Sequence, residues 1–255
     1  MAETTADQAR VPSKVLVIGG SHGIGRATTY RLTRDGAHCA IGYASNDAGA
    51  KAAADTAAAF GMRPVLAKGD LAKDGPSIVQ RAQDGLGGLD AVVVTAGVET
   101  LGRTLDTTYE QYRRAMDVQV WGLLDVVRAA TPSLAEARGS VVAVSGITAD
   151  RYAKYYGPIG PSKGALETLV KYLAAELGPR GIRVNAISPC LIADDDHWKP
   201  DDVAPFWEQV RQRTPLRRLA TPDDIANTIV ALLGPDLCYV TGNIMLVDGG
   251  YTLLS

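Results

Sequence analysis

Residues 14–25 read KVLVIGGSHGIG, and this stretch decides the fold class of the chain. The mostly apolar run Lys14–Ile18 predicts a short strand that is buried on both faces. A glycine-rich turn follows at once, and a helical pattern then runs from Gly23 to Asp35, where Gly36 would end it. Strand, glycine-rich turn and helix in this order predict the start of a βαβ unit in a parallel sheet.

The alternation of strand and helix continues along the chain. Further strands are expected at residues 39–43, 64–68, 91–95, 140–145, 182–187 and 244–247. Helical patterns lie near residues 47–60, 109–130 and 156–177, and a shorter one begins at Thr221 with Pro222 in its first turn. We therefore expect an α/β fold: a Rossmann-like, doubly wound parallel sheet of about seven strands in three layers, α/β/α.

No change of composition along the sequence indicates a second domain. Residues 1–12 are expected to form a disordered tail, and residues 13–255 a single dinucleotide-binding domain. One irregular stretch, at about 191–215, predicts a lid-like insertion with its own short helix. Its aromatic residues Trp198, Phe206 and Trp207 are candidates for covering an apolar substrate.

Charge and composition exclude several classes of protein. The 255 residues include 26 Lys and Arg against 28 Asp and Glu, and the net charge of −2 argues against a nucleic-acid-binding protein. No apolar run approaches the roughly 18 residues of a membrane-spanning helix, and residues 1–12 lack an apolar signal core, so a cytoplasmic protein is expected. Three scattered cysteines and three scattered histidines predict neither disulfides nor a metal site.

Three glycines in the first turn indicate a dinucleotide site. Gly19, Gly23 and Gly25 have the spacing G-x-x-x-G-x-G between a predicted strand and a predicted helix. Glycines at such a turn let the backbone approach a diphosphate closely, and the helix N-terminus supplies N–H groups and a favourable dipole. The context in a first βαβ unit favours a bound dinucleotide over a plain turn.

Several motifs together resemble the short-chain dehydrogenase/reductase family over essentially the whole chain after residue 12. They are GGSHGIG (19–25), GDL (69–71), TAG (95–97), SKGAL (162–166), RVNAISP (183–189) and VDGG (247–250). The resemblance implies a nicotinamide dinucleotide, a small-molecule substrate and a homotetramer or homodimer.

The resemblance also implies which residues contact the dinucleotide. Asp70 and Leu71 would meet the adenine. Ala96 and Gly97 would line the cofactor, and Lys163 would hold the nicotinamide ribose. The complete expected set is Gly19, Ser21, His22, Gly23, Ile24, Gly25, Tyr43, Ser45, Asn46, Asp70, Leu71, Ala96, Gly97, Lys163, Pro189 and Ile192.

The end of the second predicted strand bears on the choice between NADP and NAD. An acidic residue there would bind the ribose 2′-hydroxyl and repel a 2′-phosphate. Residues 42–46 read GYASN, with no acid before Asp47. Ser45, Asn46 and His22 could donate hydrogen bonds to a phosphate. NADP is therefore expected rather than NAD.

The usual catalytic residues of the family are replaced. Most members carry Tyr-x-x-x-Lys, in which the tyrosine handles the substrate proton and the lysine lowers its pKa. The residue four positions before Lys163 is Ile159, which has no acid–base chemistry. The usual serine falls at Gly146 and the usual helix asparagine at Gln119. Ordinary ketone–alcohol chemistry is in doubt on this ground.

Another spacing is present, because Tyr156 and Lys163 form Tyr-x6-Lys. This resembles the enoyl-thioester reductases of the same superfamily, in particular the bacterial acyl-carrier-protein branch. There the tyrosine donates a hydrogen bond to the thioester carbonyl and stabilises the enolate, as an oxyanion-hole donor does. Tyr152 matches a second tyrosine of that branch. The expected catalytic set is Tyr156, Lys163 and Tyr152, in an NADPH-dependent reductase of an activated C=C bond, as in an enoyl thioester, free or carrier-bound, or a related conjugated carbonyl.

Other functions stay open. Asp194 stands where the family usually has a threonine beside the nicotinamide, and a carboxylate near a diphosphate is unfavourable. A non-redox enzyme of this fold (an isomerase, dehydratase or cyclase of a biosynthetic pathway) would explain the replaced residues. So would a ketoreductase that uses a displaced tyrosine, or a non-catalytic subunit.

Overall fold

One parallel sheet forms the centre of the protein. The computed structural model describes residues 11–61, 63–98, 100–193 and 204–254. Seven strands pair in the order β3-β2-β1-β4-β5-β6-β7, and every pair is parallel. The strands are β1 (Lys14–Ile18), β2 (His38–Tyr43), β3 (Val65–Lys68), β4 (Ala91–Val94), β5 (Ser140–Val144), β6 (Arg183–Pro189) and β7 (Ile244–Val247). The strand order reverses between β1 and β4, which is where such sheets bind ligands.

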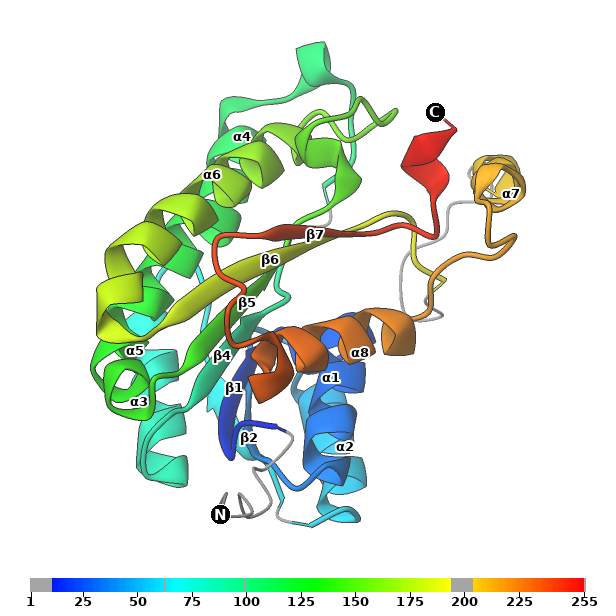
Figure 1. Ribbon diagram of the computed structural model, residues 1–255. Helices are drawn as coiled ribbons and strands as arrows, with labels where there is room; N and C mark the ends of the chain where they lie inside the picture. Colours follow the sequence, from blue (N-terminus) through cyan, green and yellow to red (C-terminus); the bar gives the residue numbers. More distant parts are fainter. Residues whose placement is uncertain (1–10, 62, 99, 194–203, 255) are drawn as a thin grey trace.

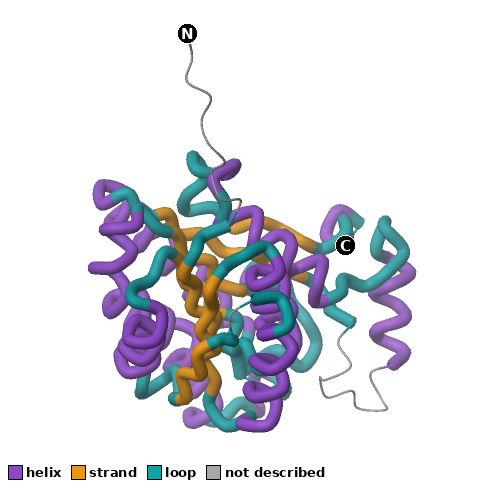
Figure 2. The backbone as a smooth tube through the Cα atoms, turned by 90° about the horizontal axis from the view of Figure 1, so that it is seen from below, coloured by secondary structure: helices purple, strands orange, loops and turns teal. Residues whose placement is uncertain are grey.

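Helices cover both faces of this sheet (Figures 1 and 2). They are α1 (Gly23–Arg34), α2 (Asp47–Ala58), α3 (Gly75–Leu86), α4 (Tyr109–Met116), α5 (Gly122–Ala137), α6 (Gly160–Leu177), α7 (Ala204–Arg213) and α8 (Pro222–Leu233). Figure 1 shows α1, α2 and α8 on one face and α3, α5 and α6 on the other. The predicted Rossmann-like fold, with about seven strands in three layers, is confirmed.

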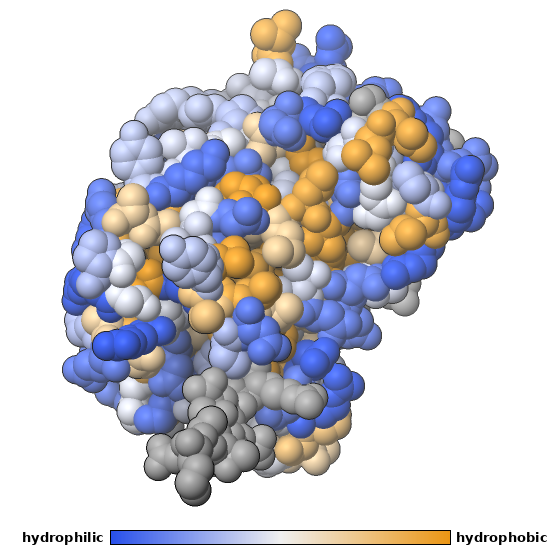
Figure 3. All heavy atoms as spheres, in the orientation of Figure 1, coloured by the Kyte–Doolittle hydropathy of each residue, from blue (hydrophilic) through white to orange (hydrophobic). Residues whose placement is uncertain are grey.

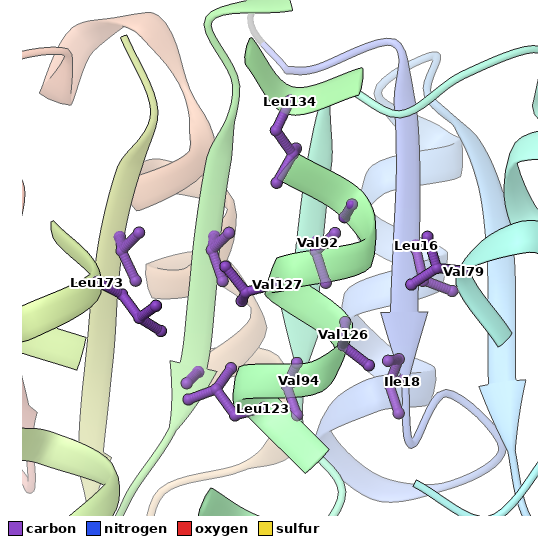
Figure 4. Close-up of a cluster of buried hydrophobic side chains, with 14 of the residues drawn as sticks. Leu16, Ile18, Val79, Val92, Val94, Leu123, Val126, Val127, Leu134 and Leu173 are labelled. Atoms are coloured by element: carbon purple, nitrogen blue, oxygen red, sulfur yellow. The ribbon is translucent and has the colours of Figure 1, made fainter. Parts of the chain in front are cut away.

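Apolar side chains fill the space between the sheet and each helical layer. In β1, Leu16 and Ile18 face one layer while Val15 and Val17 face the other, because successive strand residues point to opposite sides. Figure 4 shows Leu16 and Ile18 in the cluster that also holds residues of α3, α5 and α6. Complete burial of one such side chain contributes about 1.5–3 kcal/mol, which explains why both faces of these strands are apolar.

The chain departs from the predicted elements at two helices. The single helix expected near 109–130 is divided into α4 and α5 by a π-helical turn at Asp117–Trp121. The helix expected from Tyr156 begins at Gly160 instead. Pro161 gives the physical reason, since proline has no N–H and is tolerated only in the first turn of a helix. Residues 152–159 are therefore free to form a turn over the carboxyl edge of the sheet.

The boundaries of the expected tail and insertion also change. Val11, which we expected in the tail, is buried with the core residues beside α1 and α8. Residues 1–10 of that tail lie outside the described residues, as do residues 194–203 of the expected insertion. The described remainder of the insertion contains α7. Within the described part of the chain, no helix is long and apolar enough to cross a membrane.

Arg183 joins the start of β6 to the end of α8. Its guanidinium donates to the carbonyl oxygens of Leu232 at 2.7 Å, Leu233 at 3.0 Å and Gly234 at 3.3 Å. These carbonyls lie at a helix C-terminus, where no helical N–H can pair with them and where a positive charge is favourable. The half-buried Arg183 thus anchors the strand whose other end forms a wall of the site.

We predict that Arg183→Met lowers the free energy of unfolding by about 2 kcal/mol, since hydrogen bonds to a charged group are lost and buried carbonyls are left unpaired. Urea unfolding followed by circular dichroism measures this change. Arg180→Met is the matched control, because Arg180 is exposed, and its effect should stay within about 0.5 kcal/mol. Equal effects of the two substitutions would contradict this role of Arg183.

Candidate functional site

A cavity of about 1180 Å³ opens at the carboxyl edge of the sheet. Residues from well-separated segments line it, among them Ile24, Gly97, Ser145, Cys190, Trp207 and Tyr251. Most of its lining side chains are apolar. Figure 3 shows hydrophobic residues gathered across the middle of this face, between the main body and the lobe that holds α7 and the C-terminus. A large, mostly apolar cavity with a few polar groups is the usual form of a small-molecule site.

The turn between β1 and α1 needs its glycines. Gly19 and Gly23 have positive φ angles of 87° and 50°, which L side chains rarely adopt. A Cβ atom on Gly19 would overlap the hydroxyl of Thr95 and lie 2.9 Å from the amide nitrogen of Ala96. A Cβ atom on Gly25 would overlap the carbonyl oxygen of Gly19. The glycine motif therefore presses the first turn of α1 closely against the ends of β1 and β4.

The first turn of α1 fits the diphosphate of a dinucleotide. Within the described residues, no side chain caps this turn and no acidic residue lies in it. The backbone N–H groups at the helix N-terminus are thus not competing with a carboxylate for an anion. Ser21 is buried and its Oγ lies 3.1 Å from Nδ1 of His22, so both side chains are held beside the turn.

At the end of β2, a carboxylate is held between two donors. The Tyr43 hydroxyl donates to Asp47 at 3.0 Å, and the Lys68 ammonium donates to the same carboxylate at 2.7 Å. The hydrogen bond from Lys68 lowers the pKa of Asp47. Ser45 is exposed here, but Asn46 uses its side-chain oxygen to cap α2, accepting from the Gly49 N–H at 2.9 Å. Of the Asn46 side chain, the amide nitrogen is then left for a ligand.

The expected adenine contacts are partly used inside the protein. Asp70 forms an ion pair with Arg114 at 2.9 Å and accepts from the Ala72 N–H at 3.1 Å. The side chain of Leu71 is 5 % exposed and packs in the core, so only its backbone can meet a ligand. Ala96 packs against the same core, while the neighbouring Gly97 is exposed.

Lys163 lies at the floor of the cavity. It belongs to the first turns of α6, and its ammonium donates to the carbonyl oxygen of Val144 at 2.9 Å. Burial lowers its pKa to about 8, against the opposing effect of the Glu167 carboxylate. The cavity is also lined by Pro189 and Ile192, which come from the end of β6 and from the residues after it.

Tyr156 is a half-buried phenol on the cavity wall. Burial raises its pKa, and the Cys190 thiol acts in the same direction. Among the described residues, its hydroxyl makes no hydrogen bond to Lys163. The group therefore stays protonated at neutral pH and can donate a hydrogen bond.

Backbone strain at the preceding residue fixes the position of Tyr156. Tyr155 has φ of 69°, an uncommon value for an aromatic residue. The Gly102 N–H donates to the Tyr155 carbonyl at 2.6 Å, and the Gly157 N–H donates to the Gly102 carbonyl at 3.1 Å. This pair of bonds holds both sides of Tyr156 against the loop after β4.

The remaining residues that we considered for catalysis lie at the rim of the cavity or in its wall. Tyr152 lines the cavity but is 87 % exposed, which places it at the rim. Ile159 is 6 % exposed and contributes apolar wall to the cavity, which Gly146 also lines. Gln119, in the π-helical turn, is buried and donates to the Ser162 hydroxyl at 3.0 Å, while its side-chain oxygen has no partner. The replaced positions thus leave an apolar wall with no side-chain acid or base at either Gly146 or Ile159.

The C-terminal side of the cavity contains residues that the sequence pattern did not single out. Tyr251 lines it and lies under the Arg213 guanidinium, 5.7 Å from ring centre to charge. Trp207 of α7 lines it as expected of a covering aromatic residue. Trp198 and Asp194 lie outside the described residues. Among the described residues, no group of three or more His, Cys, Asp and Glu side chains could hold a metal ion.

Comparison with known proteins places this chain in a family. Residues 19–252 match a family model described as enoyl-(acyl carrier protein) reductase. The chain is 36 % identical over 242 residues to the L-rhamnose 1-dehydrogenase (NAD(P)(+)) of a Sphingomonas species, covering 92 % of this chain and 94 % of that protein. It is also 36 % identical over 244 residues to the granaticin polyketide synthase putative ketoacyl reductase 2 of Streptomyces violaceoruber, covering 94 % and 96 %.

Solved structures agree with these relatives. A short-chain dehydrogenase from Burkholderia cenocepacia in complex with NADP has a TM-score of 0.88 at 30 % identity, covering 96 % of this chain and 100 % of that one. The family match and the similar proteins cover nearly the whole chain, including the sheet and the glycine-rich turn. This chain therefore belongs to the short-chain dehydrogenase/reductase family of oxidoreductases.

Proposed function

We propose that the protein is an NADPH-dependent reductase of an activated carbon–carbon double bond, as in an enoyl thioester or a related conjugated carbonyl. The observation that carries this proposal is the state of Tyr156. Burial raises the pKa of this phenol, and it has no lysine partner among the described residues. Such a phenol is a hydrogen-bond donor and a poor base at neutral pH.

A donor of this kind suits the reduction of a conjugated carbonyl. The bound dinucleotide would supply the hydride for the β-carbon, and the α-carbon of the resulting enolate would take its proton from solvent. Tyr156 would donate to the carbonyl oxygen, and its hydrogen bond would strengthen as negative charge develops there in the transition state. Apolar wall residues such as Ile159 and Val144 would exclude water, and the lower local dielectric constant would strengthen that hydrogen bond. Tyr152, at the rim, is proposed to contact the substrate beyond the reacting carbonyl.

The dinucleotide would be held by the groups at the carboxyl edge. The first turn of α1 would take the diphosphate and Lys163 the nicotinamide ribose. Asp194, at the family's usual threonine position, would have to turn away from the diphosphate or be paired.

A second candidate is the interconversion of an alcohol and a carbonyl. Relatives named L-rhamnose 1-dehydrogenase and putative ketoacyl reductase favour it. Oxidation of an alcohol needs a base whose pKa lies near the working pH, and the raised pKa of Tyr156 opposes that role. Reduction of a ketone with Tyr156 as the proton donor is the form of this candidate that the site accommodates better.

NADPH is proposed as the cofactor rather than NADH. The end of β2 has no acid before Asp47, and that carboxylate is neutralised by Lys68. Lys68 would thereby keep Asp47 from repelling a 2′-phosphate. A solved relative holds NADP, which supports this preference.

We also propose a homodimer or homotetramer. The edge strand β7 leaves Leu246 half exposed, and Leu253 and Leu254 near it are 80 % and 65 % exposed. A second copy of the chain would cover such residues.

The role of Tyr156 is tested by Tyr156→Phe. We expect kcat for the NADPH-dependent reduction of a conjugated enone or enoyl thioester to fall by about 10²-fold or more, because one positioned donor is removed. The decrease of NADPH absorbance, with product analysis, measures it.

The matched control is Tyr155→Phe, which removes the neighbouring hydroxyl while keeping the ring and its contact with Lys154. Its activity should stay close to that of the unchanged protein. Turnover that Tyr156→Phe leaves intact would exclude this role, and product formed without any change of NADPH absorbance would favour a non-redox enzyme.

Cofactor preference is tested by calorimetry with NADPH and NADH. We expect NADPH to bind at least about tenfold more tightly, and Lys68→Met to weaken NADPH by about tenfold while leaving NADH nearly unchanged. Lys51→Met is the control, since Lys51 is an exposed lysine on α2. Equal affinities for the two cofactors, or equal losses for both in Lys68→Met, would contradict the assignment.

A further inference from the structure

A carboxylate lies beneath the cavity, one helical turn beyond Lys163. Glu167 follows Lys163 by four residues on α6, so the two side chains are on the same face of the helix. Glu167 is half-buried and does not itself line the cavity. Burial of a charge is unfavourable, so a half-buried carboxylate here needs a hydrogen-bond donor or a positive charge beside it.

The end of β5 holds both side chains. The Ser145 hydroxyl, in a residue that is 4 % exposed, donates to the Glu167 carboxylate at 2.7 Å. The preceding residue, Val144, accepts from the Lys163 ammonium at 2.9 Å. The Ser145 N–H donates to Ile187 of β6 at 2.8 Å, which fixes this strand end within the sheet. Acid and ammonium are thus positioned by two consecutive residues, Val144 at the end of β5 and Ser145 directly after it.

The charges around the pair single out Glu167 as the counter-charge. Burial lowers the pKa of Lys163 to about 8, and the Glu167 carboxylate acts against this. Burial raises the pKa of Glu167 itself, and Asp150 adds to that effect, whereas Ser145, Lys171 and Lys163 oppose it. Across the cavity, Tyr156 and Cys190 stay uncharged at neutral pH, because burial raises the pKa of each.

We propose that Glu167 is a positioning residue: with Ser145, it keeps the Lys163 ammonium charged and in place at the cavity floor. The inference rests on the proposed function only in assigning Lys163 to the cofactor ribose. A charged ammonium donates stronger hydrogen bonds to ribose hydroxyls than a neutral amine does. The carboxylate thus favours the ammonium form of a lysine that burial would otherwise shift toward the neutral amine.

The direct test reads the protonation of Lys163 in the free protein. Lysine labelled with ¹³C is titrated by NMR, and Lys163→Met identifies the signal. Glu167→Gln keeps the shape and an acceptor for Ser145 but removes the charge, so the pKa of Lys163 should fall by about one unit. Glu167→Asp keeps the charge and should restore most of the original value.

Glu176→Gln is the matched control, because it makes the same change on an exposed residue of the same helix. Its Lys163 signal should titrate as in the unchanged protein. Equal titrations in Glu167→Gln and Glu176→Gln would overturn the proposal. If Glu167→Gln does not fold, Ser145→Ala takes its place: loss of the tether should lower the Lys163 pKa by a smaller amount, and an unchanged pKa would overturn the proposal as well.

A second readout links the pair to the cofactor. NADPH affinity requires the ammonium form, so it should be highest below the Lys163 pKa and fall as pH rises through about 8. In Glu167→Gln this fall should move to lower pH, and in Glu176→Gln it should not move. A protein that binds neither dinucleotide would remove the proposed function, while the NMR titration would still decide the role of Glu167.

Discussion

The close contact between α1 and the end of β1 determines where everything else in the site lies. Gly25 leaves no room for a side chain against the Gly19 carbonyl, and Gly19 leaves none against Thr95. The helix N-terminus is thereby brought to the point where the strand order reverses between β1 and β4. Because parallel strands all end at this edge, the residues after β4, β5 and β6 meet at the same cavity.

In most members of the family the lysine lowers the pKa of the catalytic tyrosine, whereas in this cavity the lysine and the tyrosine have separate electrostatic neighbours. Lys163 donates a hydrogen bond to the Val144 carbonyl, and the Glu167 carboxylate raises its pKa. The pKa of Tyr156 is instead raised by burial and by Cys190. In the proposed function, the lysine serves the cofactor and the protonated phenol donates to a substrate carbonyl. The buried Ile159 agrees with this division, since its side chain has no acid–base chemistry.

Much of the fold could be predicted from the sequence because its signals are local. The apolar strands, the glycine-rich first turn and the start of α8 after Thr221 were all predicted from short patterns. The start of α6 was not, because the helical pattern extends beyond the proline that limits the helix. The contacts of Asp47 with Lys68 and of Ser145 with Glu167 join residues that are 21 and 22 positions apart. Such pairings depend on strand register and helix rotation, which no local pattern specifies.

The measurement that tests the central claim most directly follows the transferred hydrogen. A conjugated enone is reduced with NADPH that carries deuterium at both C4 positions of the nicotinamide ring, and the product is analysed by NMR. Our account predicts deuterium at the β-carbon, with the carbonyl retained. Deuterium at the carbonyl carbon would show reduction of the ketone instead, and a product without deuterium would contradict hydride transfer altogether.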